Sequence, residues 1–87
     1  MKPPKLLLHP DPIYPQLAKV AKVQGTVVID AVIDERGNVV EAHVVSGPGL
    51  LIPAALQAIT SWKYQPTILD GEAISVRMHV DVNFSLQ

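Results

Sequence analysis

The last fifth of the chain, residues 73–86, alternates apolar and polar residues without interruption. A period of two indicates a strand with one buried side and one solvent-facing side. At about 3.3 Å per residue this strand would span about 45 Å, which is long for a small domain. The apolar side consists of Ile74, Val76, Met78, Val80, Val82, Phe84 and Leu86, and the polar side of Ser75, Arg77, His79, Asp81, Asn83 and Ser85. We expect this terminal strand to lie at a sheet edge, where its backbone groups can pair with another chain, so the pattern favours binding over catalysis.

The composition limits the class of protein. A chain of 87 residues makes one domain, and 48% hydrophobic with 17% charged residues is typical of a folded one. The net charge of −1 gives no basic surface for nucleic acid. The sequence has no cysteine, which excludes disulfides and thiolate chemistry. No apolar run approaches the length that spans a bilayer.

The first half of the chain predicts a lead-in, a short helix and a hairpin. Residues 1–12 form an extended, proline-rich lead-in that is poorly ordered at its start, and the domain proper covers 13–87. A helix is predicted over Pro15–Lys22, with Leu17, Val20 and Ala21 on its apolar side. Strands are predicted over 26–33 and 39–45 around a turn at 34–38. The inward residues are Val27, Ile29, Ala31 and Ile33 on the first strand and Val40, Ala42 and Val44 on the second, with Val39, Glu41, His43 and Val45 outward.

The second half predicts a longer helix before the terminal strand. Ser46–Gly49 breaks the hairpin, and a helix over Leu51–Trp62 carries apolar residues at helical spacing. Residues 64–69 are extended, and Pro66 confines them to an edge or loop. Asp70-Gly71 is a strong two-residue turn. The residues of the second helix that should pack on the sheet are Ile52, Ala55, Leu56, Ile59 and Trp62.

Chain direction and handedness predict the topology. The two hairpin strands are antiparallel, and the second helix returns the chain so that the last strand runs parallel to the second. A right-handed crossover then places the last strand beside the first. We therefore predict an α+β fold of two layers: a three-stranded antiparallel sheet of order 2-1-3, with two helices on one face and both outer strands at edges.

The sequence gives little support for a catalytic or metal-binding site. His43 and His79 should lie on opposite outer strands with Asp30 between them, too far apart to share one zinc ion. No serine has a base and an oxyanion hole beside it, so we expect no enzyme, no metal site and no cofactor. Trp62 and Tyr64 are interpreted as core anchors rather than a ligand platform. The valines of the open face are either ordinary surface or the place where Leu6–Leu8 or a partner lies, and the residues leave these alternatives open.

An ordered set of short motifs resembles the C-terminal domain of TonB-family energy transducers over about residues 10–87. No single motif is specific, but their order and spacing are. The motifs are Tyr14-Pro15, Gly25-Thr-Val-Val, Asp34-Glu-Arg-Gly37, Val45-Ser-Gly-Pro-Gly-Leu50, Ala54-Ala-Leu56, Trp62-Lys-Tyr-Gln-Pro66, Gly71 and Val82-Asn-Phe-Ser-Leu86.

The resemblance implies a periplasmic domain of a longer protein anchored in the inner membrane. Upstream it implies a membrane helix, driven by inner-membrane motor proteins, and a proline-rich spacer whose tail is Pro3-Pro4. The domain would grip the TonB box of outer-membrane active transporters by strand addition to its last strand and couple inner-membrane energy to transport. The implied contact residues are Ser75, Val76, Arg77, Met78, His79, Val80, Asp81, Val82 and Asn83.

The sequence also departs from the family pattern. Lys19 stands where the best-known members carry a glutamine implicated near the transporter, so this additional contact is open. The alternative functions are a strand-exchanged homodimer and a general periplasmic peptide-binding module. Peptide binding without turnover separates binding from an enzyme, and a concentration-dependent mass identifies the dimer.

Overall fold

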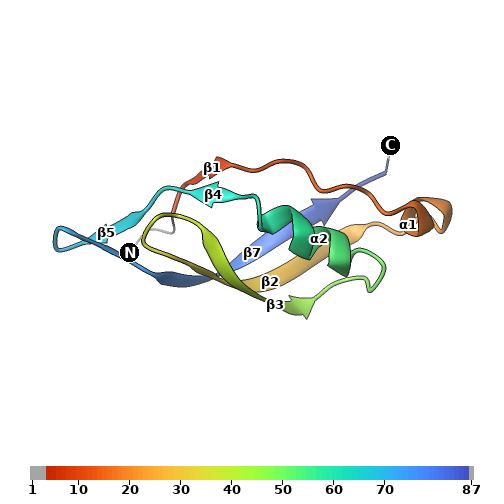
Figure 1. The fold of residues 1–87 in the computed structure, drawn as a ribbon. Helices are drawn as coiled ribbons and strands as arrows, with labels where there is room; N and C mark the ends of the chain where they lie inside the picture. Colours follow the sequence, from red (N-terminus) through yellow and green to blue (C-terminus); the bar gives the residue numbers. More distant parts are fainter. Residues whose placement is uncertain (1–3, 87) are drawn as a thin grey trace.

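The computed structural model describes residues 4–86. Its centre is a three-stranded sheet of β2 (Gly25–Ile33), β3 (Val39–Ser46) and β7 (Val76–Phe84). The order is β3-β2-β7 and both pairs are antiparallel (Figure 1). The last strand therefore lies beside the first hairpin strand, which confirms the predicted order 2-1-3.

A second layer covers one face of the sheet. Helix α2 (Ile52–Ile59) lies over the strands, and α1 (Gln16–Val20) lies at one end (Figure 1). A small ribbon of β1 (Leu6–Leu8) and β4 (Lys63–Tyr64) continues this layer. The α+β architecture is thus as predicted, with an added strand pair that the sequence pattern did not indicate.

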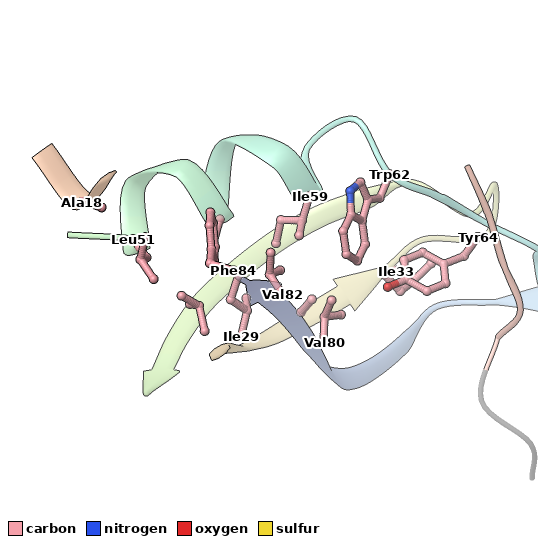
Figure 2. Close-up of a cluster of buried hydrophobic side chains, with 13 residues drawn as sticks. Ala18, Ile29, Ile33, Leu51, Ile59, Trp62, Tyr64, Val80, Val82 and Phe84 are labelled. Atoms are coloured by element: carbon pink, nitrogen blue, oxygen red, sulfur yellow. The ribbon is translucent and has the colours of Figure 1, made fainter. Parts of the chain in front are cut away.

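The core lies between these two layers. Alternate residues of β2 and β7 point into it and meet α2 from above, as Figure 2 shows for Ile29, Val82 and Ile59. Burying each such aliphatic side chain contributes roughly 1.5–3 kcal/mol. Trp62 and Tyr64 are also buried, so they are the core anchors that were predicted. The buried residues are Ala18, Val27, Ile29, Ala31, Ile33, Leu51, Ala55, Ile59, Trp62, Tyr64, Val80, Val82 and Phe84.

Both helices are shorter than predicted. In α1 the buried residue is Ala18, whereas Leu17 is 71% and Val20 72% exposed, so the predicted apolar side of this helix is wrong. A five-residue helix at the end of a sheet meets the core with little more than one side chain. In α2 the predicted face packs, but Leu51 precedes the helix and Trp62 follows it.

The predicted inward residue is wrong at the start of β3. Val39 packs on the core, whereas Val40 is 59% exposed. The pairing of β2 with β3 shifts between Val32 and Ile33, which leaves Val40 as an extra residue. Such a bulge reverses the alternation beyond it, and this explains the exchange of the two valines.

The terminal strand is divided in two. β6 (Glu72–Ile74) pairs with β5 (Thr67–Leu69), and a break at Ser75 separates β6 from β7. Asp70 and Gly71 link β5 to β6 with φ of 51° and 81°, the two positive values that a type I′ turn requires. The predicted turn is therefore present, and the predicted alternation holds along β7.

The lead-in forms a strap of residues 5–14 across the helix layer. The Gln65 amide donates to the Lys5 carbonyl at 2.7 Å, and Trp62 Nε1 donates to the Pro10 carbonyl at 3.0 Å. The Tyr14 hydroxyl donates to the Val23 carbonyl. Leu6–Leu8 thus pairs with β4 rather than lying on the open face. The expectation of poor order at the start falls on residues 1–3, which lie outside the described residues, as does residue 87.

No helix in the described part of the chain is long and apolar enough to cross a membrane.

Candidate functional site

The outer edge of β7 is the candidate site. β7 pairs with β2 residue by residue from Val76 opposite Ile33 to Phe84 opposite Gly25, with no register shift. Among residues 4–86, no strand pairs with its other side. Backbone groups of alternate residues in a strand point to opposite sides, so half of those in β7 point to this edge. The edge is a regular template for one more strand (Figure 1).

The opposite edge of the sheet is built differently. β3 contains two irregularities in its pairing with β2, which leave Val40 and Val45 as extra residues. Each bulge interrupts the row of backbone groups and twists the strand, a device that natural edge strands use against pairing. The two edges are therefore unequal: β3 is protected and β7 is regular.

The side chains of β7 divide between the two faces as predicted. Met78 and Val80 face the core layer, and Val80 and Val82 are buried. These residues can offer a guest strand mainly their backbone. Arg77, His79, Asp81 and Asn83 are exposed on the open face. Ser75 lies in the break before β7, where its hydroxyl donates to Glu35 Oε1 at 3.2 Å.

The polar side chains at the two ends of this row have partners within the sheet. Arg77 lies 3.7 Å from Asp30 Oδ2 and 4.0 Å from Glu41 Oε2. At the other end, Thr26 Oγ1 donates to Asn83 Oδ1 at 2.6 Å. The side chains of His79 and Asp81 make no hydrogen bond or ion pair with any other residue in the range 4–86. The middle of the row is thus the part available to a guest.

A charged row crosses the open face beside the site. His43 and His79 both lie opposite Asp30, one on each side, as the sequence predicted. His43 Nε2 lies 2.9 Å from Glu41 Oε1. This hydrogen bond, with a smaller effect from the positive charge of Arg77, holds the pKa of Glu41 below its usual value. In the described range, no three acidic or histidine side chains converge to hold a metal ion.

Lys19 is not close to the middle of β7. It lies on α1, which packs at the end of β7 that carries Phe84, and the Tyr14 ring meets the Phe84 ring edge to face at 5.5 Å. Arg77 lies near the other end of the strand. Lys19 therefore lies toward the Phe84 end of the candidate site and not beside its middle.

A groove between the strap and α2 was not predicted. It holds about 420 Å³, and its lining includes Pro10, Pro12 and Ile13 from the strap and Pro53, Ala54 and Gln57 from α2. No sequence signal identifies it, because it exists only where the strap packs over the helix.

Comparisons with known proteins agree with this architecture. The family described as "Gram-negative bacterial TonB protein C-terminal" matches residues 10–86. Protein TonB of Vibrio cholerae is 34% identical over 88 positions, covering 99% of this chain and 36% of that protein. Protein TonB of Xanthomonas campestris strain B100 gives the same identity and coverage. The chain thus spans about a third of the length of these relatives.

A solved structure supports the fold. The solution NMR structure of the Pseudomonas aeruginosa TonB CTD superposes with a TM-score of 0.77 at 20% identity. The match covers 95% of this chain and 86% of that one.

Proposed function

The chain belongs to the family of C-terminal domains of Gram-negative bacterial TonB protein, and from this premise we propose that it is a non-catalytic periplasmic binding module. Its partner is the TonB box of an outer-membrane transporter, an extended segment that adds as a strand to the outer edge of β7. Within a longer, inner-membrane-anchored protein, this grip couples inner-membrane energy to transport.

One observation carries the proposal: the sheet has one regular edge and one protected edge. The nine residues of β7 keep an unbroken register with β2, whereas β3 is bulged twice. Strand addition needs a continuous row of N–H and C=O groups, and of the two edges of the central sheet in residues 4–86 only that of β7 offers such a row. A guest strand on β7 continues the antiparallel or parallel ladder without moving the core.

The side chains of β7 explain what such a grip would read. Backbone pairing fixes direction and register but distinguishes few sequences, so selectivity comes from side chains that alternate with the pairing. On the open face these are His79 and Asp81, with Arg77 already engaged by Asp30. Ordering a flexible segment offsets much of the binding energy, so we expect modest affinity.

The test is an NMR titration with a TonB-box-like peptide. Amide shifts should concentrate in residues 74–85 and be largest along β7. Shifts confined to the 34–38 turn or to α2, with β7 silent, would refute strand addition while leaving the fold intact. Alanine at His79 should weaken binding less than proline there, because alanine keeps the backbone N–H.

A proline pair sharpens this test. The N–H groups of Met78 and His79 point to opposite sides of β7, so one faces β2 and the other faces the outer edge. Proline at the inward position removes a ladder hydrogen bond and should lower stability. Proline at the outward position should abolish peptide binding at a smaller cost in stability. Two variants that lose stability equally and bind peptide equally would contradict the proposal.

A further inference from the structure

Where a guest strand would add, the open face of β7 carries one carboxylate, that of Asp81, which makes no hydrogen bond or ion pair with any other residue in the range 4–86. We propose that Asp81 selects guest strands that carry lysine or arginine at the open-face position beside it. This inference rests on the proposed function, because it concerns the strand that adds to β7. It makes Asp81 a specificity-determining residue of the edge.

No charged residue of β2 lies directly opposite Asp81. Its cross-strand neighbour on β2 is Val28, and beyond Val28 lies Ser46 of β3. Neither of these side chains can balance a carboxylate charge. In this line of residues across the strands, a cation can therefore reach Asp81 only from a strand added at the outer edge of β7.

The nearby guanidinium is already committed. Arg77 lies two rows away and is shared between Asp30 at 3.7 Å and Glu41 at 4.0 Å. Asn83, on the other side of Asp81 along the strand, is held by Thr26. The open face thus presents three carboxylates, those of Asp30, Glu41 and Asp81, against one guanidinium and the imidazoles of His43 and His79, and His43 is already bonded to Glu41.

The geometry of a sheet sets the reach of this selection. Side chains directly opposite on neighbouring strands have Cβ atoms about 4.5–5.5 Å apart, close enough for a lysine or arginine to reach Asp81. Opposite charges in such exposed pairs are favourable and like charges unfavourable, each changing affinity by about two- to fivefold. A guest with lysine should therefore bind about four- to twenty-five-fold more tightly than the same guest with glutamate, because the two effects multiply.

The experiment uses three versions of one synthetic peptide. The host is a nine-residue segment of alternating threonine and valine with polar flanks, blocked at both ends, and its central threonine is kept or replaced by lysine or glutamate. Isothermal titration calorimetry gives the three affinities for the wild-type chain at two salt concentrations. The lysine peptide should bind most tightly, and the difference should shrink as salt rises.

Substitutions assign the preference to Asp81. Asp81→Asn should abolish the difference between the lysine and glutamate peptides, and Asp81→Lys should reverse it. The control is Asp70→Asn, which removes the same charge in the β5–β6 turn, where the positive φ suits asparagine. It should leave the preference unchanged.

The outcomes separate the two claims. If the neutral peptide binds and shifts β7 amides but lysine gives no advantage, or if the advantage survives Asp81→Asn, the selection is overturned and strand addition stands. If Asp70→Asn removes the advantage as fully as Asp81→Asn, the effect is one of net charge and the selection is likewise overturned. If none of the peptides binds, the proposed function and this inference fail together.

Discussion

At the scale of single residues, Gly37 joins the turn between β2 and β3 to β4. Its φ is +87°, and a Cβ there would lie 1.9 Å from the Tyr64 carbonyl oxygen. The Gly37 carbonyl accepts from the Tyr64 amide at 2.8 Å, so the two backbones cannot move apart without losing this bond. Glycine is required here by space as well as by conformation.

Replacing Gly37 with alanine should therefore destabilise the domain strongly. We expect a loss of roughly 2–4 kcal/mol in the free energy of unfolding, from a backbone clash added to the strain of a positive φ. Gly71→Ala is the matched control, because its φ is +81° but nothing lies within 4 Å of the added Cβ. It should cost only the strain, about 1–2 kcal/mol. Urea unfolding followed by Trp62 fluorescence measures both, and equal losses would contradict the clash.

Tyr64 gives the domain a dependence on alkaline pH. Burial of its side chain disfavours the phenolate and raises its pKa above the usual value near 10. A raised folded-state pKa means that its contribution is fully present below the unfolded pKa and is lost as pH rises through the folded one. The free energy of unfolding should fall less for Tyr64→Phe than for the wild type between pH 8 and pH 11. Parallel losses in urea melts would show that Tyr64 is not responsible.

At the scale of elements, the bulge in β3 decides which valine supports the core. Val39→Ala should lower the free energy of unfolding by about 1–2 kcal/mol, because Val39 packs on the buried cluster. Val40→Ala should change it by less than about 0.5 kcal/mol, because that side chain is mostly exposed. Denaturant midpoints of the two variants measure the difference. The reverse ranking would mean that β3 alternates regularly and has no bulge there.

The elements that sequence predicted well are those whose pattern spans many residues. Along a strand of nine residues such as β2 or β7, a period of two places one set of alternate residues on a single face. The burial of Val27 and Val82 therefore followed directly from the pattern. Hairpin topology and the right-handed crossover then left one sheet order. The Asp70-Gly71 turn was readable because two positive φ values demand such residues.

The elements that were missed depend on contacts between distant segments. A bulge at Val40 adds one residue to a strand that still looks apolar, and no local signal marks it. Helix α1 is too short to have a periodic face, so the burial of Ala18 in place of Leu17 follows from its docking. The strap and its groove need the Trp62 indole to find the Pro10 carbonyl, 52 residues away. The candidate edge was predicted, but its contrast with a protected β3 edge was not.

At the scale of the whole molecule, the strap and the candidate edge belong to one elongated body of 49 × 21 × 18 Å. The strap begins with β1 beside β4, crosses the helix layer beside Trp62 and reaches α1 at the end of the molecule opposite the β5–β6 hairpin (Figure 1). There the Tyr14 ring contacts Phe84 of β7. The strap is thus connected, through the contact of the Tyr14 and Phe84 rings, to the last residue of β7.

The unequal edges also determine how copies of the domain associate. Because β3 is bulged, we expect pairing or exchange between the central sheets of two chains to use β7, the same edge that we propose for the peptide. We expect monomers at micromolar concentration and dimers only at millimolar concentration.

Since one edge cannot serve both partners, a saturating TonB-box-like peptide should return the millimolar sample to monomers. Of Met78 and His79, the residue whose N–H points to the outer edge should prevent the dimer when it is replaced by proline. Val45→Lys on β3 should leave the dimer unchanged. Sedimentation velocity measures each state. A mass that stays dimeric at nanomolar dilution, or a dimer that is indifferent to the peptide, would place self-association on another surface.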